Sequence, residues 1–248
     1  MQPTYILHAR PYRETSLLLE VFSRDQGRVG VLARGVRGPK GQGRRALLQP
    51  LQPLLMAWSG RGELQSLHTV EAAGAAVPLH AEALLCAFYL NELMVRLLPR
   101  GDAQTGLFWR YAACLGELSE PDAVLAWQLR RFERDCLDFL GYGLELDAGA
   151  AAHQPLDPQA HYVLDAETGP VRLPENSNPN NHTRTVSGAA LLALREDRMP
   201  DATGLRELRR LMRAVLLHHL GGRPLQAWQV LGGLGREDID TPKPGPVV

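Results

Sequence analysis

The chain has few cysteines and no long apolar run, and both absences exclude classes of protein. Of its 248 residues three are cysteine, namely Cys86, Cys114 and Cys136, and each lies in an apolar, helix-like stretch. None belongs to a CxxC pair and their number is odd, so we expect reduced, buried thiols rather than a disulfide framework. No apolar run approaches membrane-spanning length, and the N-terminus lacks a signal-peptide pattern. We therefore expect a soluble, cytoplasmic protein.

Familiar catalytic and metal-binding motifs are also missing. The sequence has no GxxxxGK[ST] phosphate loop, no HExxH zinc motif and no GxSxG nucleophile elbow. His153, His161 and His182 are irregularly spaced, and no cysteine follows Cys136 to complete a zinc site. We therefore expect no enzyme, no catalytic residue, no metal and no cofactor. A metal-dependent nuclease built on scattered carboxylates is a less favoured alternative.

The formal net charge is zero, which argues against a general polyanion binder, but the charge is unevenly distributed. Residues 1–80 carry ten Arg and Lys against five Asp and Glu. Since the whole chain has 27 of each kind, residues 81–248 carry 17 cations and 22 acids. This asymmetry indicates a basic binding domain joined to an acidic body.

The first eighty residues show the alternation and turn residues typical of β-strands. We expect five strands, at about residues 5–9, 17–22, 28–33, 51–58 and 63–70. Five short strands predict a small, closed or nearly closed barrel. An OB-fold and an SH3-like barrel both fit this count, so periodicity alone does not choose between them. Stacking aromatics are few (Tyr5, Tyr12, Phe22 and Trp58), and some of these must be core residues.

A basic segment, residues 34–45, joins the third and fourth expected strands. It holds four glycines, no acid and five cations: Arg34, Arg37, Lys40, Arg44 and Arg45. Glycine permits close backbone approach to a partner, and each cation can neutralise one phosphate. The segment therefore predicts a mobile clamp for a nucleic-acid backbone, with a solvated hairpin tip as the alternative. If all five cations meet phosphates of one strand, the salt slope is about −0.7 × 5, or roughly −3.5.

After Val77-Pro78 the pattern changes to that of helices. We expect helices at about 84–98, 105–118, 122–140, 189–195, 205–220 and 225–231. The predicted fold is therefore α+β and multidomain, with a barrel domain at 1–78 and a helical domain at 79–240. The helical domain contains a long irregular insertion at 147–186, which includes one weak hairpin at His161–Leu164 and Val171–Leu173. Residues 241–248 form a flexible tail.

Five blocks in this order resemble the RecO family of bacterial recombination mediators. They are HARPYRETSLLLEVFSRDQGRVGVLARGVRG, LLQPLQPLLM, YLNELMVRLL, LRRFERDCLDFLGYGLEL and HHLGGRPLQ. The resemblance implies an N-terminal five-stranded OB-fold followed by a C-terminal α-helical domain. Many family members carry four zinc-binding cysteines after the fourth block. This chain has Ala148–His153 there instead, so the resemblance implies no zinc site in this chain.

The resemblance also implies a function and partners. Family members bind single- and double-stranded DNA, anneal complementary strands coated with single-strand-binding protein and, with RecR, help to load RecA. The helical domain receives the acidic, apolar C-terminal tail of single-strand-binding protein, a role that falls on Arg130, Arg131 and Phe132 in this sequence. From the residues alone, these arginines would instead pair with Glu133 or Asp135.

A second class of function stays open. In this alternative the barrel recruits proteins as a scaffold and contacts DNA only incidentally, which the zero net charge favours. Reversal of the charges at Arg37, Lys40, Arg44 and Arg45 separates the two hypotheses, because only the DNA-binding hypothesis predicts lost annealing with partner binding intact.

Overall fold

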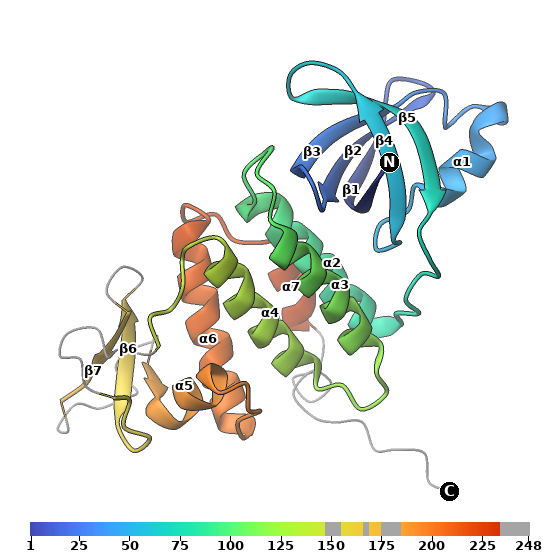
Figure 1. The fold of residues 1–248 in the computed structure, drawn as a ribbon. Helices are drawn as coiled ribbons and strands as arrows, with labels where there is room; N and C mark the ends of the chain where they lie inside the picture. The colour runs from blue at the N-terminus through green and yellow to red at the C-terminus, as the bar shows by residue number, and fades with distance from the viewer. Residues whose placement is uncertain (147–154, 166–168, 175–184, 234–248) are drawn as a thin grey trace, which may run out of the picture. The chain divides into compact units, whose positions relative to one another are not determined.

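The N-terminal strands form a closed barrel (Figure 1). A computed structural model describes residues 1–146, 155–165, 169–174 and 185–233. The barrel strands are β1 (Gln2–Tyr12), β2 (Ser16–Ser23), β3 (Gly27–Ala33), β4 (Leu54–Ser59) and β5 (Leu64–Ala72). Their order is β1-β2-β3-β5-β4, in which β1 pairs with β4 to close the barrel and β3 runs parallel to β5. This is an OB-fold barrel, and the predicted barrel is confirmed.

The barrel core follows from the alternation of apolar residues along each strand. Leu19 and Val21 of β2 pair with Val31 and Val29 of β3, and these four side chains are buried inside the barrel. The residues between them face outward. The Val36 side chain, just beyond β3, and Leu48, before β4, are also buried in this core, so the chain re-enters the barrel at both ends of the basic segment.

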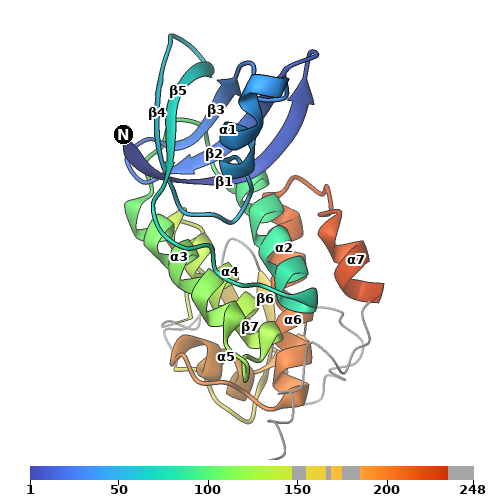
Figure 2. The ribbon, with the colours of Figure 1, turned by 90° about the vertical axis from the view of Figure 1, so that its right-hand side faces the viewer.

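The basic segment is more regular than the sequence predicts. Pro39–Gly41 form a 3-10 turn, η1, and Gln42–Leu47 form a short helix, α1, which lies beside β5 (Figures 1 and 2). The expectation of an irregular loop is therefore wrong for residues 39–47. Glycine was expected to allow close approach of a partner, but Gly41 allows close packing within the segment itself. A Cβ on Gly41 would lie 2.4 Å from the carbonyl oxygen of Gly35. Gly35 itself has a φ of +70°.

Three helices share a compact unit with the barrel: α2 (Ala81–Leu97), α3 (Thr105–Ser119) and residues Leu225–Leu231, which include most of α7 (Ala227–Gly233). Hydrogen bonds join these elements, and those made by Asn91 are buried. The Tyr111 hydroxyl donates to Asn91 Oδ1 (2.5 Å), and Asn91 Nδ2 donates to the carbonyl of Leu7 in β1 (3.0 Å). The Glu92 carboxylate accepts from the backbone N–H groups of Gln226 and Ala227 at the start of α7.

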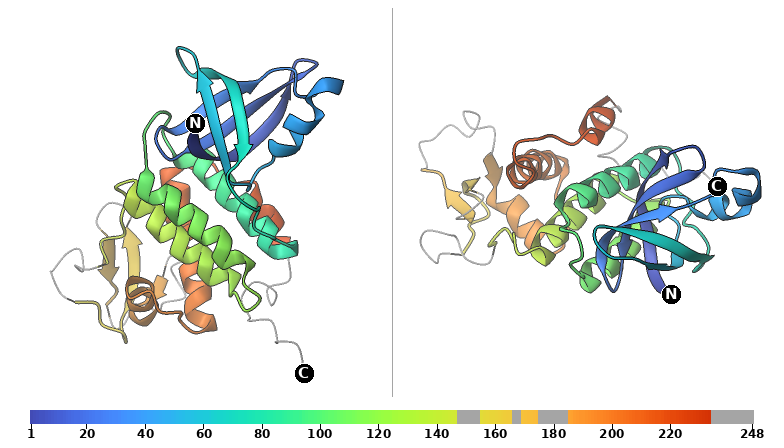
Figure 3. Two further views of the ribbon diagram at one scale, coloured as in Figure 1. Left: turned by 45° about the vertical axis from the view of Figure 1, so that its right-hand side comes forward. Right: turned by 90° about the horizontal axis from the view of Figure 1, so that it is seen from above.

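The second compact unit is built on Pro121–Pro224. It contains α4 (Leu125–Phe139), α5 (Gly188–Arg195) and α6 (Ala202–His219), with α4 packed against α6. It also contains a small sheet of β6 (His161–Asp165), β7 (Gly169–Arg172) and β8 (Thr185–Ser187) in the order β7-β6-β8, which contacts α5 and α6 (Figure 3). The predicted hairpin is confirmed as β6–β7, whereas β8 was not expected. None of the helices in the described ranges is long and apolar enough to cross a membrane.

The division of the chain is not simply strands against helices. The boundary predicted at residue 78 falls between β5 and α2, yet the compact unit that holds the barrel continues to Glu120. The domain limits 1–78 and 79–240 therefore stay a prediction. Much of the predicted insertion at 147–186 and all of the predicted tail at 241–248 lie outside the described residues.

Two glycines of the basic segment give opposite predictions for stability. Gly41→Ala places a methyl group against the backbone of Gly35 and Val36, and we expect it to lower the free energy of unfolding by about 1–3 kcal/mol. Gly43 lies in α1 with nothing within 4 Å of an added Cβ, so Gly43→Ala should raise it by roughly 0.5–1 kcal/mol. Urea denaturation measures both, and equal effects of the two substitutions would contradict the packing of Gly41.

Candidate nucleic-acid interface

The five cations of the basic segment lie at the surface. Arg34, Arg37, Lys40 and Arg45 are exposed and Arg44 is half-buried. The last four of these residues lie between Val36 and Leu48, which enter the core, and their charged side chains remain in water. Among the described residues, none of the five forms an ion pair with a carboxylate. Their positive charge is therefore available to a polyanion.

Two of these cations also fix the shape of the segment. Arg37 Nη1 donates to the carbonyl of Arg13 (3.2 Å), and the Arg37 backbone N–H donates to the carbonyl of Thr15 (2.9 Å), in the turn between β1 and β2. Arg44 Nη2 donates to the carbonyl of His68 in β5 (2.6 Å). Carbonyl acceptors orient a guanidinium without cancelling its charge, so both arginines remain cationic while they hold the segment on the barrel.

The aromatic residues of the barrel divide as the alternation predicts. Tyr5 and Phe22 are buried and pack against Phe108 of α3, with ring centroids 5.5 Å apart in each pair. Tyr12 and Trp58 remain partly exposed. Two of the four aromatics are therefore core residues, and two stay accessible at the surface of the barrel.

The block predicted to receive a protein tail has a different environment. Arg130 and Phe132 are 5% and 0% exposed, and Arg130 Nη2 lies 2.5 Å from Glu133 Oε1, one turn along α4. Glu133 is also buried. Neither Arg130 nor Phe132 is accessible to a peptide without rearrangement. The pairing with Glu133, which the residues alone favoured, is the one that the structure contains.

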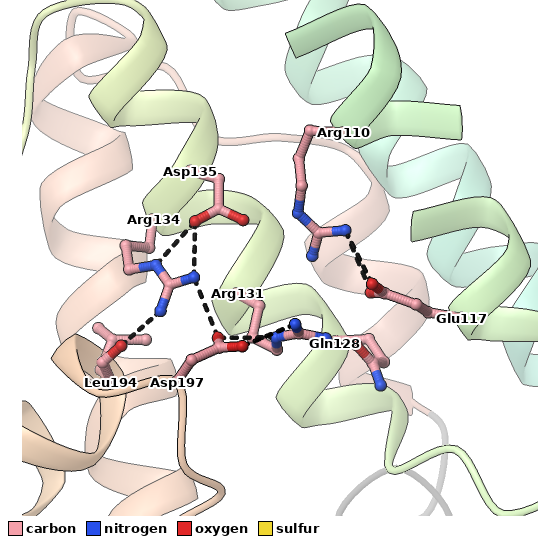
Figure 4. A network of polar contacts seen from close by, with 8 residues as sticks. All are labelled: Arg110, Glu117, Gln128, Arg131, Arg134, Asp135, Leu194 and Asp197. Atoms are coloured by element: carbon pink, nitrogen blue, oxygen red, sulfur yellow. Dashed lines mark hydrogen bonds and ion pairs between the residues drawn. The ribbon is translucent and has the colours of Figure 1, made fainter. Parts of the chain in front are cut away.

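Arg131 is the accessible member of the block, and its charge is already compensated (Figure 4). Its guanidinium makes two parallel contacts with Asp197, Nε to Oδ1 at 2.9 Å and Nη2 to Oδ2 at 2.8 Å. Arg134 joins Asp197 and Asp135 (3.1 and 2.7 Å). The hydrogen bond from Arg131, with the nearby positive charges of Arg131 and Arg134, holds the pKa of Asp197 below its ordinary value, so this carboxylate is ionised near neutral pH.

The described residues do not assemble a metal centre. No three His, Cys, Asp or Glu side chains within them are placed to hold a metal ion. A hollow of about 510 Å³ on the second unit is lined by Asp135, Asp138 and Glu145, but also by Arg134 and Arg195. The segment Ala148–His153, where many family members carry zinc-binding cysteines, lies outside the described residues.

The structure thus belongs to a class: an OB-fold followed by helices, with a cationic segment that forms no ion pair with the carboxylates of the described residues. Two family models match the chain, Recombination protein O N terminal over residues 1–76 and Recombination protein O C terminal over residues 79–229. DNA repair protein RecO of Xanthomonas euvesicatoria pv. vesicatoria (strain 85-10) is 49% identical over 232 residues, which cover 94% of this chain and 96% of that protein. DNA repair protein RecO of Xylella fastidiosa (strain M12) is 47% identical over 234 residues, with the same coverage of both chains. The chain belongs to the RecO family of DNA repair proteins.

The buried Arg130–Glu133 pair generates a prediction about stability. Glu133→Gln removes one charge and leaves the Arg130 guanidinium buried opposite a neutral amide. We expect the free energy of unfolding to fall by about 3–5 kcal/mol, since breaking a buried pair strands a charge. The double variant Arg130→Met/Glu133→Leu removes both charges and should lose less. Thermal and urea denaturation measure the difference, and a double variant less stable than Glu133→Gln would contradict it.

Proposed function

We propose that this protein binds single- and double-stranded DNA through Arg34, Arg37, Lys40, Arg44 and Arg45. It anneals complementary strands that are coated with single-strand-binding protein. The observation that supports this proposal is a set of surface cations that form no ion pair with any carboxylate of the described residues, on a barrel whose family acts in DNA repair. Phosphate contacts position a strand without reading its sequence. They also reduce the repulsion between two approaching strands.

Family membership extends the proposal to further partners. With RecR, the protein promotes loading of RecA onto gapped DNA, and it does so in the cytoplasm at the nucleoid. It hydrolyses no nucleotide and needs no metal or cofactor, since its role is to hold strands. The measurement is RecA loading on gapped DNA coated with single-strand-binding protein, with and without RecR.

Removal of three exposed charges tests DNA binding while keeping the hydrogen bonds that hold the basic segment on the barrel. In Arg34→Gln/Lys40→Gln/Arg45→Gln, the residues that bond to backbone carbonyls, Arg37 and Arg44, are retained. For a single strand, we expect the slope of log K against log salt to become shallower by about 2, from roughly −3.5. Annealing should fall in parallel, because the same contacts hold both strands. Fluorescence anisotropy of labelled oligonucleotides at several salt concentrations measures the slope.

A matched control removes the same charge elsewhere. Arg206, Arg209 and Arg210 lie on the polar face of α6 and are exposed or half-buried, so their replacement by Gln changes the net charge equally. This control should keep the original slope and annealing rate. If the two triple variants behaved alike, DNA contact would be incidental, and the scaffold hypothesis would be favoured.

We also propose that the block Arg130, Arg131 and Phe132 marks the site for the C-terminal tail of single-strand-binding protein. Because Arg130 and Phe132 are buried, Arg131 is the residue that meets the tail's carboxylates directly. The fork of a guanidinium suits this contact, since it binds carboxylates through two parallel hydrogen bonds. Asp197 now occupies that fork, so an incoming carboxylate competes with it.

This competition gives two opposite predictions for tail binding. Arg131→Ala should weaken binding of a labelled tail peptide about ten-fold or more, the usual effect of losing a charged hydrogen bond. Asp197→Asn removes the competing charge and should strengthen binding. Peptide anisotropy measures both, with Arg206→Ala as the control for a lost positive charge. Unchanged affinity in Arg131→Ala would place the tail elsewhere.

A further inference from the structure

The outer face of the barrel contains a hollow next to the basic segment. Its volume is about 830 Å³, within the range of small-molecule sites. Four neighbouring strands and the turn between β1 and β2 line it, through Tyr12, Arg13, Glu14, Thr15, Ser16, Leu32, Arg34 and Leu64. Strand pairing explains why these residues meet, because Tyr12 lies opposite Ser16, and β3 next to β5 places Leu32 near Leu64.

The chemistry of the hollow combines an aromatic platform, apolar side chains and two cations. The Arg13 guanidinium lies over the Tyr12 ring, 5.4 Å from its centroid. Leu64 is 43% exposed, which leaves apolar surface open beside this platform. Arg34 adds a second exposed cation, whereas Glu14 is the one carboxylate among the described residues of the lining. Flat apolar surface next to positive charge suits a nucleobase attached to its phosphate.

The hollow is structurally continuous with the basic segment. Arg34 belongs to both, and Arg37 donates from the segment to the carbonyl of Arg13. Arg13 has a φ of 52°, the left-handed region that an arginine adopts at a cost. These bonds keep the turn that carries Arg13 beside the segment, so a strand lying along the cations passes the hollow.

We propose that this hollow holds one unpaired base of single-stranded DNA. The base stacks on the Tyr12–Arg13 platform, and its neighbouring phosphate meets Arg34. Stacking uses the face of the base, which every base possesses, and therefore needs no particular sequence. This inference rests on the proposed DNA-binding function and adds to it a preference for unpaired strands.

The experiment separates base contacts from phosphate contacts. Tyr12→Ala is tested against oligothymidylate, an abasic sugar-phosphate chain of the same length, and a duplex. We expect affinity for oligothymidylate to fall about ten-fold, while affinity for the abasic chain and the duplex stays the same. Tyr12→Phe keeps an aromatic ring and should restore binding. Phe88→Ala, which removes an exposed ring from α2, is the control and should leave all three affinities unchanged.

Photocrosslinking provides a second test that does not depend on a substitution. Wild-type protein bound to oligonucleotides containing 5-iodouracil is irradiated, and the crosslinked peptide is mapped by mass spectrometry. A crosslink at Tyr12 supports the inference. Equal losses by Tyr12→Ala on oligothymidylate and on the abasic chain, or crosslinks confined to other residues, would overturn it. The proposed function would fail separately, through the unchanged salt slope of the triple-Gln variant.

Discussion

The burial of two apolar side chains determines where the positive charge of this barrel lies. Val36 and Leu48 occupy the barrel core at the two ends of the basic segment. Between them the chain has to leave the core, because buried, unpaired charges are strongly unfavourable. The close contact of Gly41 with Gly35 then folds the excursion back on itself. The cationic surface is thus a product of core packing and does not require a ligand to form.

Arginine has two distinct roles in this chain, and the acceptor decides between them. In the basic segment, Arg37 and Arg44 donate to backbone carbonyls, which fixes their position and leaves their charge unbalanced. In the second unit, Arg131 and Arg134 donate to carboxylates, which balances it. A net charge of zero for the whole chain is therefore compatible with a strongly cationic barrel surface.

Sequence patterns predicted the elements that carry a clear periodicity and missed a short helix that depends on tertiary packing. Strand alternation located the barrel, and the helix expected at 189–195 is α5, which begins where the Ser187 side chain accepts from the Ala190 N–H. Helix α1 was missed because it has six residues and a glycine-rich approach, and such a short helix forms only against other structure. The buried Arg130 had a detectable signal: Ala126, Arg130, Glu133 and Leu137 follow helical spacing and all are buried.

Phosphate contacts alone do not make the protein distinguish the separate strands from the annealed duplex. Cations that grip sugar-phosphate chains hold separate strands and the finished duplex by the same interaction. A base stacked on the Tyr12–Arg13 platform is different, because in a duplex both faces of that base contact its neighbours in the stack. If the hollow holds a base as proposed, pairing must remove that base, and the contact is lost as the duplex forms. On the two proposals above, stacking therefore adds affinity for unpaired DNA that the duplex does not share, and its loss on pairing favours release of the product.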